Sequence, residues 1–332
     1  MGKTNRTVPI VLGDMGKKLN KKIIYNAIKI AVSVVLVVIL YFSIDLNYVV
    51  GEIIRMAAWF LLAVLGLAII GMILEVVKWR VLLSGYSYRL LAKAFLYSQF
   101  FILALPGALF GEAAKIAVFG KDTDSYDRSV STVAIDKMTG LIGLMIFGVA
   151  GLLLTREELP PAFMGIVIFF LVFAILVISS MRIPVIRGGF LKLIEFLRAK
   201  MKRFDKFYDN AAGVVTTWNE YLYKPSLLVK SVAFGLLFNA VLLGQYVLVC
   251  WYYGIPAAWV DLAWMIPLVG VVQALPISLA GIGIRDVSMV AMFAYIGVTA
   301  EQAMILALCL LIVIIFRAVC GAAVILWDVA RK

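Results

Sequence analysis

The chain has 332 residues, of which 64% are apolar and only 15% are charged, whereas soluble domains carry about 25% charged residues. Its 31 Lys and Arg outnumber its 19 Asp and Glu, which gives a net charge of +12, and it contains no histidine. The lack of histidine excludes Ser-His-Asp triads and His-ligated metals. The three cysteines, Cys250, Cys309 and Cys320, lie in apolar runs and predict neither a disulfide framework nor a metal site.

Apolar runs long enough to cross a bilayer define the fold class. A hydrocarbon core of about 30 Å needs about 20 apolar residues in a helix, and lipid cannot satisfy the backbone of an open strand. We therefore predict an all-α integral membrane protein, a polytopic helical bundle forming one transmembrane domain over 23–328, behind a basic cytoplasmic segment, 1–22. Full spans are expected at about 23–44, 56–77, 129–154, 161–181, 227–252 and 301–327.

Two further apolar segments, about 90–120 and 261–297, are interrupted by proline and glycine. Proline removes a helix hydrogen bond, and glycine permits a sharp reversal of the chain. Each segment is either an ordinary kinked span or a re-entrant hairpin that enters and leaves the membrane on the same side. The interrupting residues are Pro106, Gly107 and Gly111 in the first segment, and Pro276, Gly281 and Gly283 in the second.

Loop charges favour the hairpins. With both segments re-entrant, all three loops dense in Lys and Arg lie in the cytoplasm, as the positive-inside rule requires. If the first segment crossed once, the most basic loop would lie outside. We therefore predict two hairpins of opposite orientation, cytoplasmic termini and location in the plasma membrane. The dense loops are 1–22, 78–93 and 182–206, and the sparse ones are 45–55, 155–160 and 253–261.

The two hairpins also resemble each other in sequence. Ala104–Pro106 followed by Glu112 corresponds to Ala274–Pro276 followed by Asp286. In transporters built from inverted repeats, such broken helices surround a binding site at the membrane midplane. The match favours a transporter with a site exposed alternately to the two sides.

The basic segment 188–210 carries an apolar stripe that includes Phe190, Leu197 and Phe204. This spacing places the stripe on one face of a helix. We predict an interfacial amphipathic helix on an anionic leaflet. Packing against a partner protein is the alternative.

Polar residues at membrane depth are the candidates for the functional site, because a charge there costs about 2.5–3.5 kcal/mol or more. Cations in a polar cavity would attract a lipid phosphate, and the alternative is that the charges form internal ion pairs. Arg317 has no acidic residue within one turn of its own helix, so we predict that it faces the ligand without a fixed partner. The candidate substrate-binding residues are Glu112, Lys115, Asp136, Lys137, Gln273, Arg285, Asp286 and Arg317.

These residues resemble a known family over about 23–327. The stretch LPGALFGEAAKIAVFGK, the pair Asp136-Lys137, the stretch PISLAGIGIRD and the later Phe316-Arg317 are similar to the transmembrane domain of lysylphosphatidylglycerol synthases. The resemblance implies a domain that translocates aminoacylated phospholipid, and we expect a stand-alone member without the soluble synthase domain. The family's acid–base pair is usually Glu-Arg, so the lysine here lacks the guanidinium fork for bidentate phosphate binding.

The sequence thus predicts a membrane lipid translocase or lipid-binding transporter for a phosphate-bearing amphiphile, either an anionic or aminoacylated phospholipid or a polyprenyl-phosphate-linked sugar. The alternative is a membrane scaffold that presents a lipid carrier to a separate synthase or glycosyltransferase. A membrane-embedded transferase is disfavoured, because no nucleotide-binding loop or catalytic motif is visible. We expect no cofactor, no metal and no nucleic acid; the expected partners are membrane lipids, with a lipid-modifying enzyme and self-association left open.

Overall fold

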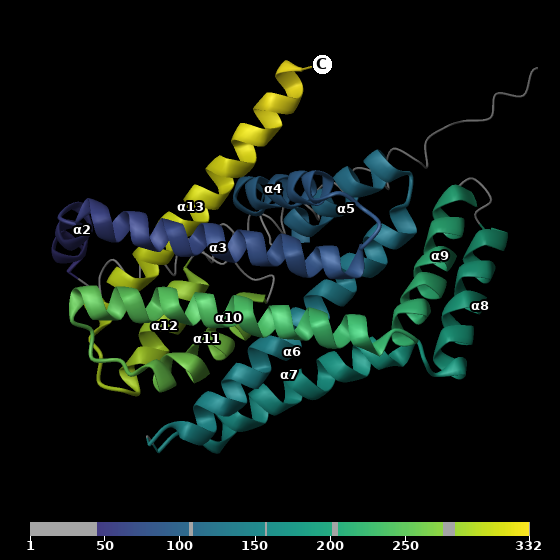
Figure 1. Cartoon of the computed structure of the whole chain (residues 1–332). Helices are drawn as coiled ribbons and strands as arrows, with labels where there is room; N and C mark the ends of the chain where they lie inside the picture. The colour runs from purple at the N-terminus through teal and green to yellow at the C-terminus, as the bar shows by residue number, and fades with distance from the viewer. Residues whose placement is uncertain (1–44, 106–108, 157, 201–204, 275–282, 332) are drawn as a thin grey trace, which may run out of the picture.

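The computed structural model describes residues 45–331 except 106–108, 157, 201–204 and 275–282. This part of the chain forms twelve helices and no strand (Figure 1). The predicted first span, 23–44, and the predicted break residues Pro106, Gly107, Pro276 and Gly281 lie outside the described residues. The helices are α2 (Leu46–Ile54), α3 (Ala58–Leu82), α4 (Tyr88–Ala104), α5 (Leu109–Thr123), α6 (Tyr126–Leu154), α7 (Pro161–Ser180), α8 (Pro184–Lys200), α9 (Asp205–Leu222), α10 (Pro225–Tyr253), α11 (Trp259–Ala274), α12 (Ile284–Ala294) and α13 (Ala300–Ala330).

Five of these helices, α3, α6, α7, α10 and α13, are long and apolar enough to cross a membrane. They coincide with the five predicted spans that fall in the described part of the chain. Helix α7 illustrates their apolar outer surface, since the side chains of Phe169, Phe173 and Leu176 are all exposed. A soluble monomer rarely exposes so continuous an apolar surface, whereas lipid covers it without penalty. The chain is therefore a multi-pass helical membrane protein.

Two helix pairs are inserted between the long helices, α4 with α5 and α11 with α12. The last residue of α3, Leu82, and Arg128 near the start of α6 line one small cavity, so the chain enters and leaves the α4–α5 pair at the same end of the bundle. At the opposite end, Thr155 after α6 donates a hydrogen bond to Asp261 in α11, and α13 packs beside α2. The pairs thus return to opposite ends, and their re-entry from the two faces of a bilayer stays a prediction.

Close helix contacts hold α4 against its neighbours. At Gly321 of α13 a Cβ atom would overlap the carbonyl oxygen of Leu96 and lie 2.9 Å from the nitrogen of Phe100. At Gly111 of α5 it would lie 2.9 Å from the carbonyl oxygen of Ser98. Small residues at helix interfaces let backbones approach in this way. Helix α4 is therefore fixed mainly to α5 and α13.

The predicted amphipathic helix over 188–210 corresponds to two helices and not to one, and its location at the membrane interface stays a prediction. The segment is divided between α8 and α9, which pack side by side (Figure 1), and residues 201–204 between them lie outside the described residues. Arg198 of α8 joins the two helices through ion pairs of 3.1 Å to Asp205 and 2.9 Å to Asp209. Only α9 packs extensively on the bundle, chiefly on α6.

Candidate functional site

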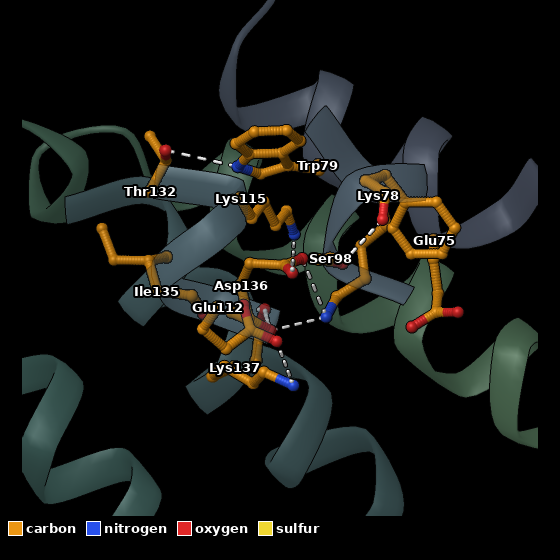
Figure 2. Close-up of polar contacts among 12 residues, drawn as sticks. Glu75, Lys78, Trp79, Ser98, Glu112, Lys115, Thr132, Ile135, Asp136 and Lys137 are labelled. Carbon is orange, nitrogen blue, oxygen red and sulfur yellow. Dashed lines mark hydrogen bonds and ion pairs between the residues drawn. The ribbon is translucent and has the colours of Figure 1, made fainter. Parts of the chain in front are cut away.

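The centre of the site is Asp136 of α6, whose carboxylate is shared by two lysines (Figure 2). Lys78 of α3 places its Nζ 3.1 Å from Oδ1 and also donates to the Asp136 backbone oxygen at 2.6 Å. Lys115 of α5 places its Nζ 3.2 Å from Oδ2 and 4.2 Å from the centre of the Trp79 ring. The three charged side chains are only 8%, 6% and 12% exposed for Lys78, Lys115 and Asp136. Two buried ammonium groups therefore share one carboxylate.

The next residue, Lys137, points to a different partner. Its Nζ lies 2.7 Å from Oε1 of Glu112 on α5, because adjacent residues of a helix are about 100° apart around its axis. The side chain of Lys137 is 56% exposed and that of Glu112 is 17% exposed. The second carboxylate oxygen of Glu112, Oε2, is buried and accepts no hydrogen bond from the described residues. The predicted acid–base neighbours Asp136 and Lys137 thus belong to two separate ion pairs.

Arg317 of α13 has a fixed partner, contrary to the prediction. Its Nη2 is bonded to Oε2 of Glu75 on α3, and its guanidinium carbon lies 5.7 Å from the centre of the Phe95 ring. The prediction failed because it searched for an acid only along the helix that carries the arginine. Nε of Arg317 is buried without a hydrogen-bond partner among the described residues, so the guanidinium has donor capacity beyond this pair.

Sequence reasoning also missed the two α3 residues of the cluster. Glu75 is the only charged residue of the predicted span 56–77, and this isolation was the signal that could have identified it. Lys78 was assigned to the basic loop 78–93, but α3 continues to Leu82 and buries Lys78 to 7% exposure. It is hard to predict from sequence that a helix continues past a charged residue when an acid on another helix compensates the charge.

These side chains line a cavity of about 200 Å³ between α3, α4, α5, α6, α11 and α13. A second cavity of about 300 Å³ shares Glu75, Asp136 and Lys137 with it, and a third of about 280 Å³ shares Gln273 and Arg317. Six of the eight predicted site residues line the first cavity. They are Glu112, Lys115, Asp136, Lys137, Gln273 and Arg317.

The other two predicted residues, Arg285 and Asp286, bind mainly each other. Oδ1 of Asp286 accepts from Nε and Nη2 of Arg285 at 2.9 and 2.7 Å, while Oδ2 accepts from the backbone N–H of Gly283 at 3.1 Å. Gly283 has φ of 83°, a conformation that favours glycine. Arg285 also donates to the backbone oxygen of Ala307 on α13 at 3.2 Å. The pair fastens the start of α12 to α13; Arg285 lines the third cavity, whereas Asp286 lines none of the three.

The cluster has one more cation than it has anions. Glu75 and Glu112 each form an ion pair with one cation, and Asp136 forms ion pairs with two. An uncompensated buried charge is costly, and the cluster, which lines the first and second cavities together, carries one positive charge that its own acids do not compensate. The cations are Lys78, Lys115, Lys137 and Arg317, and the anions are Glu75, Glu112 and Asp136.

Fold and site together define a multi-pass helical membrane protein with a cluster of charges enclosed among its helices. The chain belongs to the family described as "Lysylphosphatidylglycerol synthase TM region", which matches residues 26–321. The family suspected from the sequence is thereby confirmed, and with the membrane helices it identifies a membrane lipid-related protein. Neither the curated proteins nor the solved structures with which the chain was compared match it significantly.

Proposed function

We propose that this protein is a membrane lipid translocase or lipid-binding transporter, and not an enzyme, whose substrate is a phosphate-bearing amphiphile. Candidate substrates are an anionic or aminoacylated phospholipid and a polyprenyl-phosphate-linked sugar. The observation that carries the proposal is the surplus positive charge of the cluster, which arises because Lys78 and Lys115 share Asp136. Lys115 lines the first cavity and Lys78 lines the second. A lipid phosphate would neutralise this surplus. Family membership supports lipid as the source of the phosphate.

The side chains of the cavity suggest how a phosphate would be held. Lys115, Lys137 and Arg317 line it and supply charged donors, which form the strongest hydrogen bonds to phosphate. Glu75 and Glu112 pair with two of these cations and keep them oriented when no phosphate is bound. Binding then exchanges ion pairs within the protein for ion pairs with the lipid.

The positions of Glu112 and Gln273 support alternating exposure of the site. Glu112 on α5 follows the predicted break residues Pro106 and Gly107, Gln273 on α11 precedes the predicted break residue Pro276, and both Glu112 and Gln273 line the same cavity. The two helix pairs that contain these breaks return to opposite ends of the bundle. In the proposal they are re-entrant hairpins in the plasma membrane, the chain termini are cytoplasmic, and each hairpin controls access from one side.

Native mass spectrometry of the purified protein tests the binding step. Wild-type protein is expected to retain phosphate-bearing lipid through gentle purification. Lys115→Met should retain about tenfold less, because one hydrogen bond to a charged group contributes about 1.5–3 kcal/mol. The matched control is Arg198→Gln with Asp205→Asn, which removes a charge pair on α8 and α9 and should leave retention unchanged.

Two results would contradict the translocase reading. Retention of phosphate lipid that is equal in wild type, Lys115→Met and the control would show that the cavity does not bind it. The accessory scaffold would instead be supported by three results together: lipid retention that depends on Lys115, an enzyme that co-purifies at fixed stoichiometry, and no movement of lipid across the membrane.

A further inference from the structure

An apolar groove of about 330 Å³ lies on the outer surface between α3 and α4. Along α3 it extends from Ile69 to Val77, which corresponds to about 12 Å of helix. Ile69 and Ile73, on the α3 side, are 44% and 56% exposed, so the groove opens toward the surrounding lipid. It exists because α4 packs mainly on α5 and α13 and less on α3. The groove residues are Ile69, Met72, Ile73, Val76, Val77, Tyr88, Ala92, Phe95 and Leu96.

Phe95 connects this groove to the polar cavity. The residue lines both of them, its side chain is only 3% exposed, and the Arg317 guanidinium lies 5.7 Å from its ring centre. On α3, Val76 lines the groove and its neighbour Glu75 lines the cavity. A phosphate in the cavity and a hydrocarbon chain in the groove would therefore lie on opposite sides of one aromatic ring.

We propose that the groove between α3 and α4 binds a hydrocarbon chain of the amphiphile whose phosphate occupies the cavity, and that Phe95 closes the lateral opening between the two. This inference rests on the proposed function. The groove runs along the membrane-spanning helix α3, where the medium is hydrocarbon. The adjoining cavity presents Lys115, Lys137 and Arg317, whose charged groups can bind a lipid phosphate. Rotation of the Phe95 ring opens the route by which the headgroup enters from the bilayer.

The test compares ligands with and without chains on the full-length protein in detergent. Dioleoyl phosphatidylglycerol probes both subsites and glycerol phosphate probes the cavity alone; saturation-transfer NMR detects the weaker ligand. Ala92→Trp and Ile73→Trp fill the groove, and Ile73 is the safer position for folding because it is 56% exposed. Ala150→Trp on α6 is the control, because Ala150 is exposed and lines none of the cavities described above.

Both groove variants should bind dioleoyl phosphatidylglycerol about tenfold more weakly, the loss expected when roughly two methylene groups leave an apolar site. They should bind glycerol phosphate as wild type does, and Ala150→Trp should bind both ligands normally. Unchanged lipid affinity in both groove variants, or an equal loss of glycerol phosphate, would overturn the chain subsite while leaving the proposed function intact. Failure of the wild-type protein to bind either ligand would refute the proposed function itself.

Discussion

The acids of the cluster differ in how many cations depend on them. Asp136 compensates both Lys78 and Lys115, whereas Glu112 and Glu75 each have one partner. The Asp136 group is also the most enclosed, since Glu75 remains 31% exposed. Neutralising each acid should therefore have a different effect on the free energy of unfolding.

Asp136→Asn should destabilise the protein strongly, by about 3–5 kcal/mol, because it leaves two buried ammonium groups without a counter-charge. Lys115→Met should cost much less, about 1 kcal/mol, since Asp136 keeps Lys78 and the methionine fills the space of the lysine stem. Thermal unfolding in detergent measures both. Equal loss of stability in the two variants would show that the two lysines do not share Asp136.

Arg317→Gln should cost about 2 kcal/mol, below the about 3–5 kcal/mol of a fully buried pair, because the two side chains remain 20% and 31% exposed. Adding Glu75→Gln should restore part of the loss, because no unpaired carboxylate then remains. A double variant that is less stable than the sum of the two single changes would contradict the Glu75–Arg317 pair.

At the scale of helices, the seam between α4 and α13 is the closest contact of the first helix pair with the bundle. Gly321 makes it possible, since a Cβ there would overlap Leu96 and approach Phe100. The two helices also meet near their polar ends, where Lys93 of α4 lies 3.0 Å from Asp328 of α13. The close approach at Gly321 and this ion pair together fasten α4 to α13.

Gly321→Ala should force α4 and α13 apart and cost about 1–3 kcal/mol, the usual effect of overpacking. Gly66→Ala on α3 is the matched control, because a Cβ at that position would meet nothing within 4 Å. Alanine should there be neutral or stabilising by up to about 1 kcal/mol. Melting temperatures that fall equally in the two variants would argue against a tight seam.

The long spans were predictable because each is an apolar run well above the length that a bilayer requires. Six of the cavity residues were predictable, since charges at membrane depth are too costly to face lipid, but Glu75 of the same cavity was missed. Their partners were not predictable, because pairing across helices depends on how each helix is rotated: Glu75 and Arg317 are 242 positions apart in the chain. The division between α8 and α9 was missed because the apolar stripe continues through it.

The orientation of the whole molecule stays a prediction that labelling can test. In a variant without native cysteines, Glu158→Cys and Pro256→Cys should react with an impermeant thiol reagent from outside the cell. Lys192→Cys on α8 should react only after the membrane is permeabilised, because the segment 182–206 that contains it is rich in Lys and Arg and is therefore expected in the cytoplasm. Labelling of Lys192→Cys in intact cells would refute the assignment of both hairpins.

Movement of lipid across the bilayer is the central claim, and reconstitution into liposomes tests it most directly. A fluorescent phosphatidylglycerol probe, bleached by a reagent confined to the outside, reports the fraction of probe that crosses. With wild-type protein, the bleached fraction of the probe should rise well above the half that the outer leaflet holds. With the double variant Glu75→Gln and Arg317→Gln, only that half should be bleached although the protein remains folded. If the double variant bleaches as much probe as wild type does, the result would contradict a route through the charged cavity. If wild-type protein bleaches only the probe in the outer leaflet, the result would contradict translocation of this lipid.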